Sequence, residues 1–193
     1  MAKVTAWDRQ REAVRDEITR TALELFLQQG FEATTVDQIL ERVGVSRRSF
    51  FRYFGTKEDV VLGDLVHRGV VIAEALSRRP ADEEPWDAIR AAFRDADEMS
   101  SLDGPATLAL GRMLFETPSL LARHAQKRLR WQELLVPLIE ARLPEGGDRE
   151  LRASAIVAAA LACLDAASRA WVEGDVQADL GDLYDQAVLA VRR

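Results

Sequence analysis

The chain has 193 residues, of which 48% are hydrophobic and 30% are charged, a composition typical of a folded globular protein. Acidic residues outnumber basic residues by 32 to 26, and the net charge of -6 excludes a uniformly polycationic protein that coats nucleic acid or membranes. The single cysteine, Cys163, excludes an intrachain disulfide framework, and we expect it to be a buried, unreactive thiol. The first residues lack an apolar signal core, so we expect a soluble cytoplasmic protein without a membrane partner.

Helical periodicity runs through most of the sequence, and stretches that alternate apolar with polar residues are nearly absent. This pattern favours an all-α fold of about nine helices. A first helix is predicted from about residue 9 to residue 29 and ends before Gly30. The sequence Thr-Val-Asp-Gln at 35–38 has the form of a capping box, so a short second helix begins there and ends at Gly44.

Two more helices follow closely, because Ser46 is a cap for a third helix and Thr56 for a fourth. A helix, a tight turn at Gly44 and another helix together make the layout of a helix-turn-helix, whose second helix enters the major groove of DNA. We therefore expect a helix-turn-helix domain in residues 1–57 and a helical domain in residues 58–193.

The sequence of the second domain predicts five further helices after the fourth helix. Pro137 is expected to kink or break the third of these five, and Gly146 with Gly147 is expected to form a turn. The approximate ranges of the five helices are 86–99, 103–116, 118–143, 148–173 and 179–191.

The last helix carries a continuous apolar stripe, which must pack either on the chain's own core or on a second copy of the chain. The preceding helix is rich in alanine, so another helix can approach it closely. In the second case the stripe is the dimer interface, and its members are Leu180, Leu183, Tyr184, Ala187, Val188 and Val191.

The charge is distributed unevenly along the chain. Residues 1–57 have a net charge of +2, whereas residues 58–193 have a net charge of -8. The window 42–57 contains five basic residues and no acidic residue. This asymmetry indicates contact with nucleic acid. The alternative is that the arginines only form a solvated helix face, but an acid-free window of this length is unusual in so acidic a chain.

The predicted third helix has a core face and an outer face. Phe50 and Phe54 are four residues apart and should face the core. The outer faces would then carry Arg47, Arg48, Ser49, Arg52 and Tyr53. Arginine can bond to guanine through two parallel hydrogen bonds, and the helix starts at Thr35 and Lys57 suit phosphate.

The first 65 residues resemble the DNA-binding region of TetR-type transcriptional regulators. Three segments carry the resemblance: GFEATTVDQI at 30–39, VGVS at 43–46 and FFRYFGTKEDV at 50–60. The resemblance implies a homodimeric, usually repressing regulator that responds to a small-molecule effector. It also implies that the last two helices form the dimer contact. A twofold dimer places its two recognition helices about 34 Å apart, which predicts a palindromic operator.

Carried over by position, four residues of the third helix would face bases, namely Arg47, Arg48, Ser49 and Arg52, while Thr35, Tyr53 and Lys57 would contact phosphate. Many relatives have tyrosine where this chain has Phe51. Without a hydroxyl group Phe51 cannot make a polar contact, so we expect it to be a packing residue. The FFRYF form is similar to an actinobacterial subset that includes regulators responding to acyl thioesters.

Candidate residues for binding an effector lie on the inward faces of the middle helices. For each apolar candidate the alternative is that the side chain only packs in the core. Asp165 and Arg169 are four residues apart on an apolar helix, so they either pair with each other or orient a polar group of a ligand. The full candidate set is Trp86, Phe93, Met99, Met113, Phe115, His124, Trp131, Asp165, Arg169 and Trp171.

The sequence offers little for metal or catalytic chemistry. Its two histidines, His67 and His124, lack a paired ligand spacing, and no phosphate-binding loop or nucleophile motif is present. We expect no metal site, no cofactor and no enzymatic activity. Two alternatives stay open: a DNA-binding regulator or activator without an effector, and an all-helical enzyme or adaptor.

Overall fold

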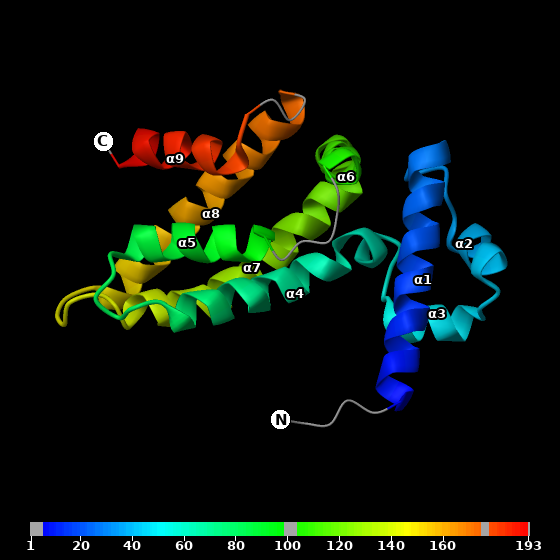
Figure 1. The fold of residues 1–193 in the computed structure, drawn as a ribbon, viewed down its shortest axis with the longest axis horizontal. Helices are drawn as coiled ribbons and strands as arrows, with labels where there is room; N and C mark the ends of the chain where they lie inside the picture. The colour runs from blue at the N-terminus through cyan, green and yellow to red at the C-terminus, as the bar shows by residue number, and fades with distance from the viewer. Residues whose placement is uncertain (1–5, 99–103, 175–177, 193) are drawn as a thin grey trace. The chain divides into compact units, whose positions relative to one another are not determined.

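The computed structural model describes residues 6–98, 104–174 and 178–192, and these ranges form nine α-helices and no strand (Figure 1). The all-α fold is therefore confirmed. The helices divide into two compact units, the N-terminal unit Met1–Gly63 and the C-terminal unit Asp64–Arg193. The division falls within the fourth helix, whereas the sequence places the domain boundary at the start of that helix.

In the N-terminal unit, α1 (Ala6–Gln29) packs against α2 (Val36–Val43), and α2 packs against α3 (Arg47–Tyr53). Figure 1 shows α2 and α3 on the same side of α1. The apolar faces of the three helices and the start of α4 (Glu58–Arg78) enclose one small core. Its largest buried side chains are those of Ile18, Phe26, Phe31, Ile39, Phe50, Phe54 and Leu62.

Local capping sets the helix starts in this unit, as the sequence predicts. The hydroxyl of Thr35 accepts from the backbone N–H of Gln38 at 3.3 Å, and the Gln38 side chain accepts from the backbone N–H of Thr35 at 2.8 Å. Ser46 Oγ accepts from the backbone N–H of Ser49 at 3.1 Å. Gly44 ends α2 with φ of 75°, a left-handed conformation that glycine adopts without strain. The turn between α2 and α3 is therefore tight and fixed in direction.

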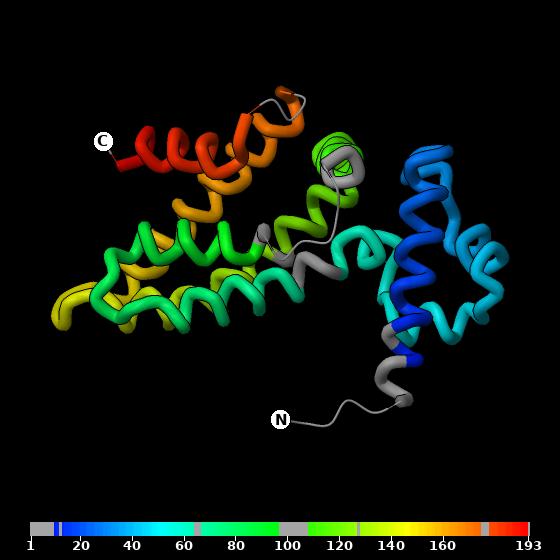
Figure 2. Tube along the Cα trace, viewed as in Figure 1, coloured from blue at the N-terminus to red at the C-terminus, as the bar shows by residue number. Residues whose placement is uncertain are grey.

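The C-terminal unit holds the rest of α4 and five further helices. Within it, α8 packs most extensively against α7 and α9, and the chain reverses between α7 and α8 through the yellow turn in Figure 2 that contains Gly146 and Gly147. The five helices are α5 (Pro85–Glu98), α6 (Gly104–Glu116), α7 (Pro118–Glu140), α8 (Arg149–Glu173) and α9 (Leu180–Val191).

Pro137 does not break α7, which continues to Glu140. A proline inside a helix removes one backbone donor. The carbonyl of Pro137 still accepts from the N–H of Ala141 at 3.1 Å, so the last turn of the helix stays hydrogen-bonded. Pro137 is also exposed, so its ring has space on the solvent side of the helix.

The core of the C-terminal unit draws on α4, α5, α7, α8 and α9. Cys163 is buried in this core, and burial raises the pKa of its thiol, which agrees with an unreactive residue. Within the described ranges α8 alone is long and apolar enough to cross a membrane, but a core helix of a soluble protein has the same properties. Seven side chains of α8 are buried within the unit, which fits a core helix.

Candidate nucleic-acid interface

The two faces of α3 separate as the sequence predicts. Phe50 has an exposed fraction of 0% and Phe54 one of 3%, and their rings meet with centroids 5.5 Å apart. Arg47, Arg48 and Arg52 are all exposed. The helix is therefore anchored by its aromatic face and presents its arginines to solvent.

Arg47 is held by an acidic residue that lies outside the acid-free window. Its Nη2 donates to both carboxylate oxygens of Asp37, at 2.5 Å to Oδ1 and 2.6 Å to Oδ2. Asp37 belongs to the first turn of α2, so the ion pair links the two helices across the turn. Both side chains are exposed, and such a pair contributes little to stability. The ion pair does, however, hold the Arg47 side chain in place. Before Arg47 can contact a base, the pair must open, or Arg47 must share its N–H donors between Asp37 and the base.

Arg52 and Tyr53 form a second local cluster. Arg52 Nη2 donates to the hydroxyl of Tyr53 at 3.0 Å, and its guanidinium lies 5.0 Å from the centroid of the tyrosine ring. The guanidinium of Arg11 lies 5.9 Å from the same ring. Tyr53 therefore lies beside two cations, one from α1 and one from α3, which places its hydroxyl in a positive environment suited to phosphate.

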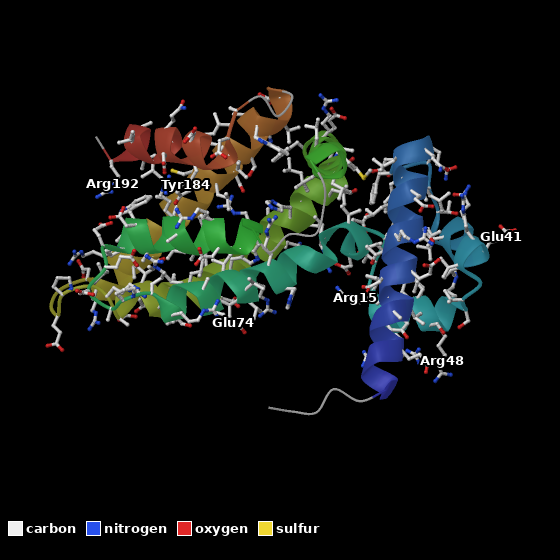
Figure 3. All side chains as sticks on the ribbon, in the orientation of Figure 1. Arg15, Glu41, Arg48, Glu74, Tyr184 and Arg192 are labelled. Carbon is white, nitrogen blue, oxygen red and sulfur yellow. The ribbon has the colours of Figure 1, made fainter. Side chains whose placement is uncertain are left out.

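Arg48 differs from the other two arginines of α3. Among the residues that the structure describes, it has no hydrogen-bond or ion-pair partner, and Figure 3 shows it projecting outward. Ser49 lies beside it and is half-buried, with its hydroxyl 3.0 Å from that of Ser46. Arg48 is thus the basic side chain of α3 that is ready to bind without first breaking a contact.

Thr35 and Lys57 lie at the starts of α2 and α4. Thr35 is exposed, and its hydroxyl also caps α2. Lys57 Nζ donates to the carbonyls of Phe31 at 2.7 Å and Thr34 at 3.0 Å, and it lies 4.2 Å from the centroid of the Phe31 ring. Because an ammonium has three N–H donors, one remains for phosphate. The phosphate contacts of both residues stay predictions.

Phe51 packs only in part, which corrects the expectation of a packing residue: its ring contacts that of Phe50, with centroids 5.4 Å apart. Its exposed fraction is 49%. The periodicity of α3 could have revealed this, because with Phe50 and Phe54 facing inward, residue 51 lies beside Arg47 and Arg48 on the outer side. No sequence pattern indicates the ion pair of Asp37 with Arg47, because the two residues are ten positions apart on different helices.

The candidate effector residues fall into different packing groups of the C-terminal unit. Phe93 and Trp131 belong to its buried core, and Trp86 packs against that core. The Phe93 ring meets Tyr184 of α9 edge-on at 5.5 Å. Met113, Phe115, His124 and Trp171 are half-buried, and Met99 lies outside the described residues.

Asp165 pairs with Arg128 of α7, not with Arg169. Burial lowers the pKa of Arg128, and its Nε is buried without a hydrogen-bond partner in the described part of the chain. Arg169 instead lies over the Phe115 ring, 4.6 Å from the centroid. The two polar candidates on α8 therefore contact different helices, Asp165 reaching α7 and Arg169 reaching α6.

The apolar stripe of α9 packs within the chain. Tyr184 is buried, and Leu180, Leu183, Ala187 and Val188 are partly buried against the core of the C-terminal unit. Arg90 of α5 also binds Asp185 of α9 through two hydrogen bonds. Val191 alone among the stripe residues is exposed. A dimer contact through the stripe stays a prediction, and the exposed leucines of α8 and α9 lie elsewhere, at Leu151 and Leu189.

Two family profiles match the chain. Residues 18–63 match the profile described as bacterial regulatory proteins, tetR family, and residues 83–193 match the MftR C-terminal domain. The chain belongs to the TetR family. The first match covers the helix-turn-helix described above, and the second covers α5 to α9. The chain is therefore a DNA-binding transcriptional regulator, and its relatives are regulators rather than enzymes.

Curated TetR-family relatives extend the match along most of the chain. The transcriptional regulator TcmR of Streptomyces glaucescens is 39% identical over 163 residues, which cover 81% of this chain and 72% of TcmR. A transcriptional regulator MftR of Mycobacterium tuberculosis is 28% identical over 137 residues, covering 69% of this chain and 68% of MftR.

Solved TetR-family structures share the fold. The TetR-family repressor FadR of Thermus thermophilus, solved in complex with lauroyl-CoA, has a TM-score of 0.58 at 25% identity and covers 92% of each chain. NalD, a repressor of a multidrug efflux pump in Pseudomonas aeruginosa, has a TM-score of 0.57 at 21% identity and covers 96% of each chain. At the identity of NalD the likeness concerns the fold alone.

Proposed function

We propose that this TetR-family regulator is a homodimeric repressor that binds a palindromic operator through α3 and leaves it when an effector binds. The observation that carries the proposal is the outer face of α3, where Arg48, which has no partner within the described ranges, lies beside Phe51 and the partnered Arg47 and Arg52. Arginine side chains at this place can donate two hydrogen bonds to guanine in the major groove.

Charge orients the molecule in this proposal. The window 42–57 carries a net charge of +5, whereas residues 58–193 carry -8. DNA attracts the former and repels the latter, so approach by the basic end is favoured. The proposed site of action is the cytoplasm, where bacterial DNA lies.

The test of operator binding is selection of bound duplexes from a random pool by the wild-type protein. A twofold dimer with two recognition helices about 34 Å apart selects half-sites that are related by inversion. We expect a palindromic consensus. Failure to enrich any duplex, or enrichment without symmetry, would contradict the proposed mode of binding.

We propose that the dimer contact uses the exposed faces of α8 and α9. Leu151 of α8 has an exposed fraction of 65%, and on α9 Leu189 and Val191 have exposed fractions of 57% and 58%, so the outer sides of both helices carry apolar side chains that a second copy could cover. The acidic variant with Leu151→Glu and Leu189→Glu should be monomeric by sedimentation and should bind the operator poorly, because a monomer contacts one half-site.

A matched control for this variant is Leu129→Glu. Leu129 lies on α7 and is exposed to a similar extent, at 59%. We expect this control to remain dimeric. A dimer that persists with both Leu151→Glu and Leu189→Glu would rule out the proposed interface.

The proposed effector is a hydrophobic molecule of the acyl thioester class. T. thermophilus FadR was solved with lauroyl-CoA, and the C-terminal unit of this chain combines an apolar interior with the partly buried pair of Arg128 and Asp165. Lauroyl-CoA is therefore the probe. Allosteric coupling of the usual size would weaken operator binding by about 5- to 150-fold. Equal affinity with and without saturating acyl thioesters would favour the alternative of an effector-independent regulator.

A further inference from the structure

Phe51 is an exposed aromatic side chain in the middle of the proposed DNA-reading helix. One side of its ring rests on the buried ring of Phe50, with centroids 5.4 Å apart and an edge-on interplanar angle of 88°. About half of the side chain, 49%, remains open to solvent. The contact with Phe50 covers one side of the ring and leaves the other side open to a partner.

The neighbours of Phe51 identify the kind of partner. Arg47 and Arg48 lie one helical turn before it, and Arg52 follows it. Asp37 holds the guanidinium of Arg47, and Tyr53 holds that of Arg52. An apolar ring surrounded by cations does not suit a purely apolar surface, but it does suit a polyanion that also displays apolar groups.

The major groove of DNA is such a surface. Among the base edges in that groove, thymine alone adds an apolar group, the C5 methyl, to its hydrogen-bonding atoms. A phenylalanine ring has no ordinary hydrogen-bond donor or acceptor, so an apolar contact is its strongest means of discriminating between bases. Of the groups that base edges display in the major groove, the C5 methyl of thymine is therefore the one that suits Phe51.

We propose that Phe51 is a specificity-determining residue that packs its exposed ring against the C5 methyl of one thymine in each operator half-site. This inference rests on the proposed entry of α3 into the major groove. Burying one methyl group corresponds to about a fourfold gain in affinity, so two half-sites give about fifteenfold. Phe51 adds to the hydrogen bonds of Arg48 a preference that hydrogen bonding alone does not provide.

The test replaces each thymine of the selected duplex with deoxyuridine, which removes the C5 methyl and keeps every hydrogen-bonding atom. Affinity is measured by fluorescence anisotropy. For the wild type we expect a loss of about fifteenfold when one symmetry-related pair of thymines is replaced. For Phe51→Ala we expect weaker binding to the thymine duplex and equal binding to the two duplexes. Phe51→Leu, which keeps an apolar side chain, should retain part of the discrimination.

Leu27→Ala is the matched control, because Leu27 is an apolar side chain of the same unit with a similar exposed fraction, 51%. It should discriminate thymine from deoxyuridine as the wild type does, and circular dichroism establishes that each variant is folded. The role of Phe51 is overturned if the wild type binds every deoxyuridine duplex as tightly as the thymine duplex. It is also overturned if Phe51→Ala still discriminates between the two duplexes. In both cases the operator proposal stands. If no palindromic duplex is selected, both proposals are overturned.

Discussion

Replacing Arg48 with alanine is expected to weaken binding to the operator by about 30-fold or more. Each bidentate contact of arginine with guanine contributes about 1–3 kcal/mol, and a symmetric dimer makes two such contacts. Arg48 is exposed and has no partner among the described residues, so its removal leaves the fold unchanged. Fluorescence anisotropy on the selected duplex measures the loss.

The control for this variant is Arg20→Ala, which removes the same charge from the same unit. Arg20 lies on α1 and pairs with Glu17 and Glu24 on the helix surface. We expect its operator affinity to stay within about twofold of the wild type, because exposed ion pairs contribute little. Equal losses for Arg48→Ala and Arg20→Ala would mean that net charge, not a base contact, governs affinity.

Phe50→Ala is expected to destabilise the N-terminal unit by about 3–5 kcal/mol, since truncating a fully buried phenylalanine removes apolar contacts and leaves a cavity. Phe50 has an exposed fraction of 0% and contacts both Phe51 and Phe54. Typical domains unfold at a free energy of about 5–15 kcal/mol, so this loss is a large part of the total. Operator binding should fall with it, because α3 loses its anchor.

Urea denaturation measures this loss, and hydrogen exchange locates it in α2 and α3 rather than in α8. The neighbouring variant Phe51→Ala provides the comparison, with an expected cost of about 1 kcal/mol or less for a half-exposed side chain. If the two variants were destabilised equally, the assignment of Phe50 to the core and of Phe51 to the surface would be wrong.

The sequence predicted features that depend on residues close together in the chain. The capping box at Thr35 and the caps at Ser46 and Thr56 each join residues three positions apart, so the motif and the contact coincide. The core face of α3 was predictable for the same reason, since helical periodicity places Phe50 and Phe54 together.

Contacts between distant segments were not predictable. Arg128 and Asp165 meet from α7 and α8, and the spacing of Asp165 to Arg169 suggested a different pair. Periodicity showed that one face of α9 is apolar, but it could not determine whether α8 or a second chain covers that face. In the structure Tyr184 of that face is buried in the chain's own core, and Leu180, Leu183, Ala187 and Val188 are only partly buried against it.

The most direct test of the central claim, that α3 reads operator bases through Arg48, is to repeat the selection from a random pool with Arg48→Ala. We predict a consensus that keeps the symmetry and the thymine that Phe51 contacts but loses its preference at one base pair in each half-site. A consensus unchanged at every position, with all base preferences as strong as those of the wild type, would contradict the claim.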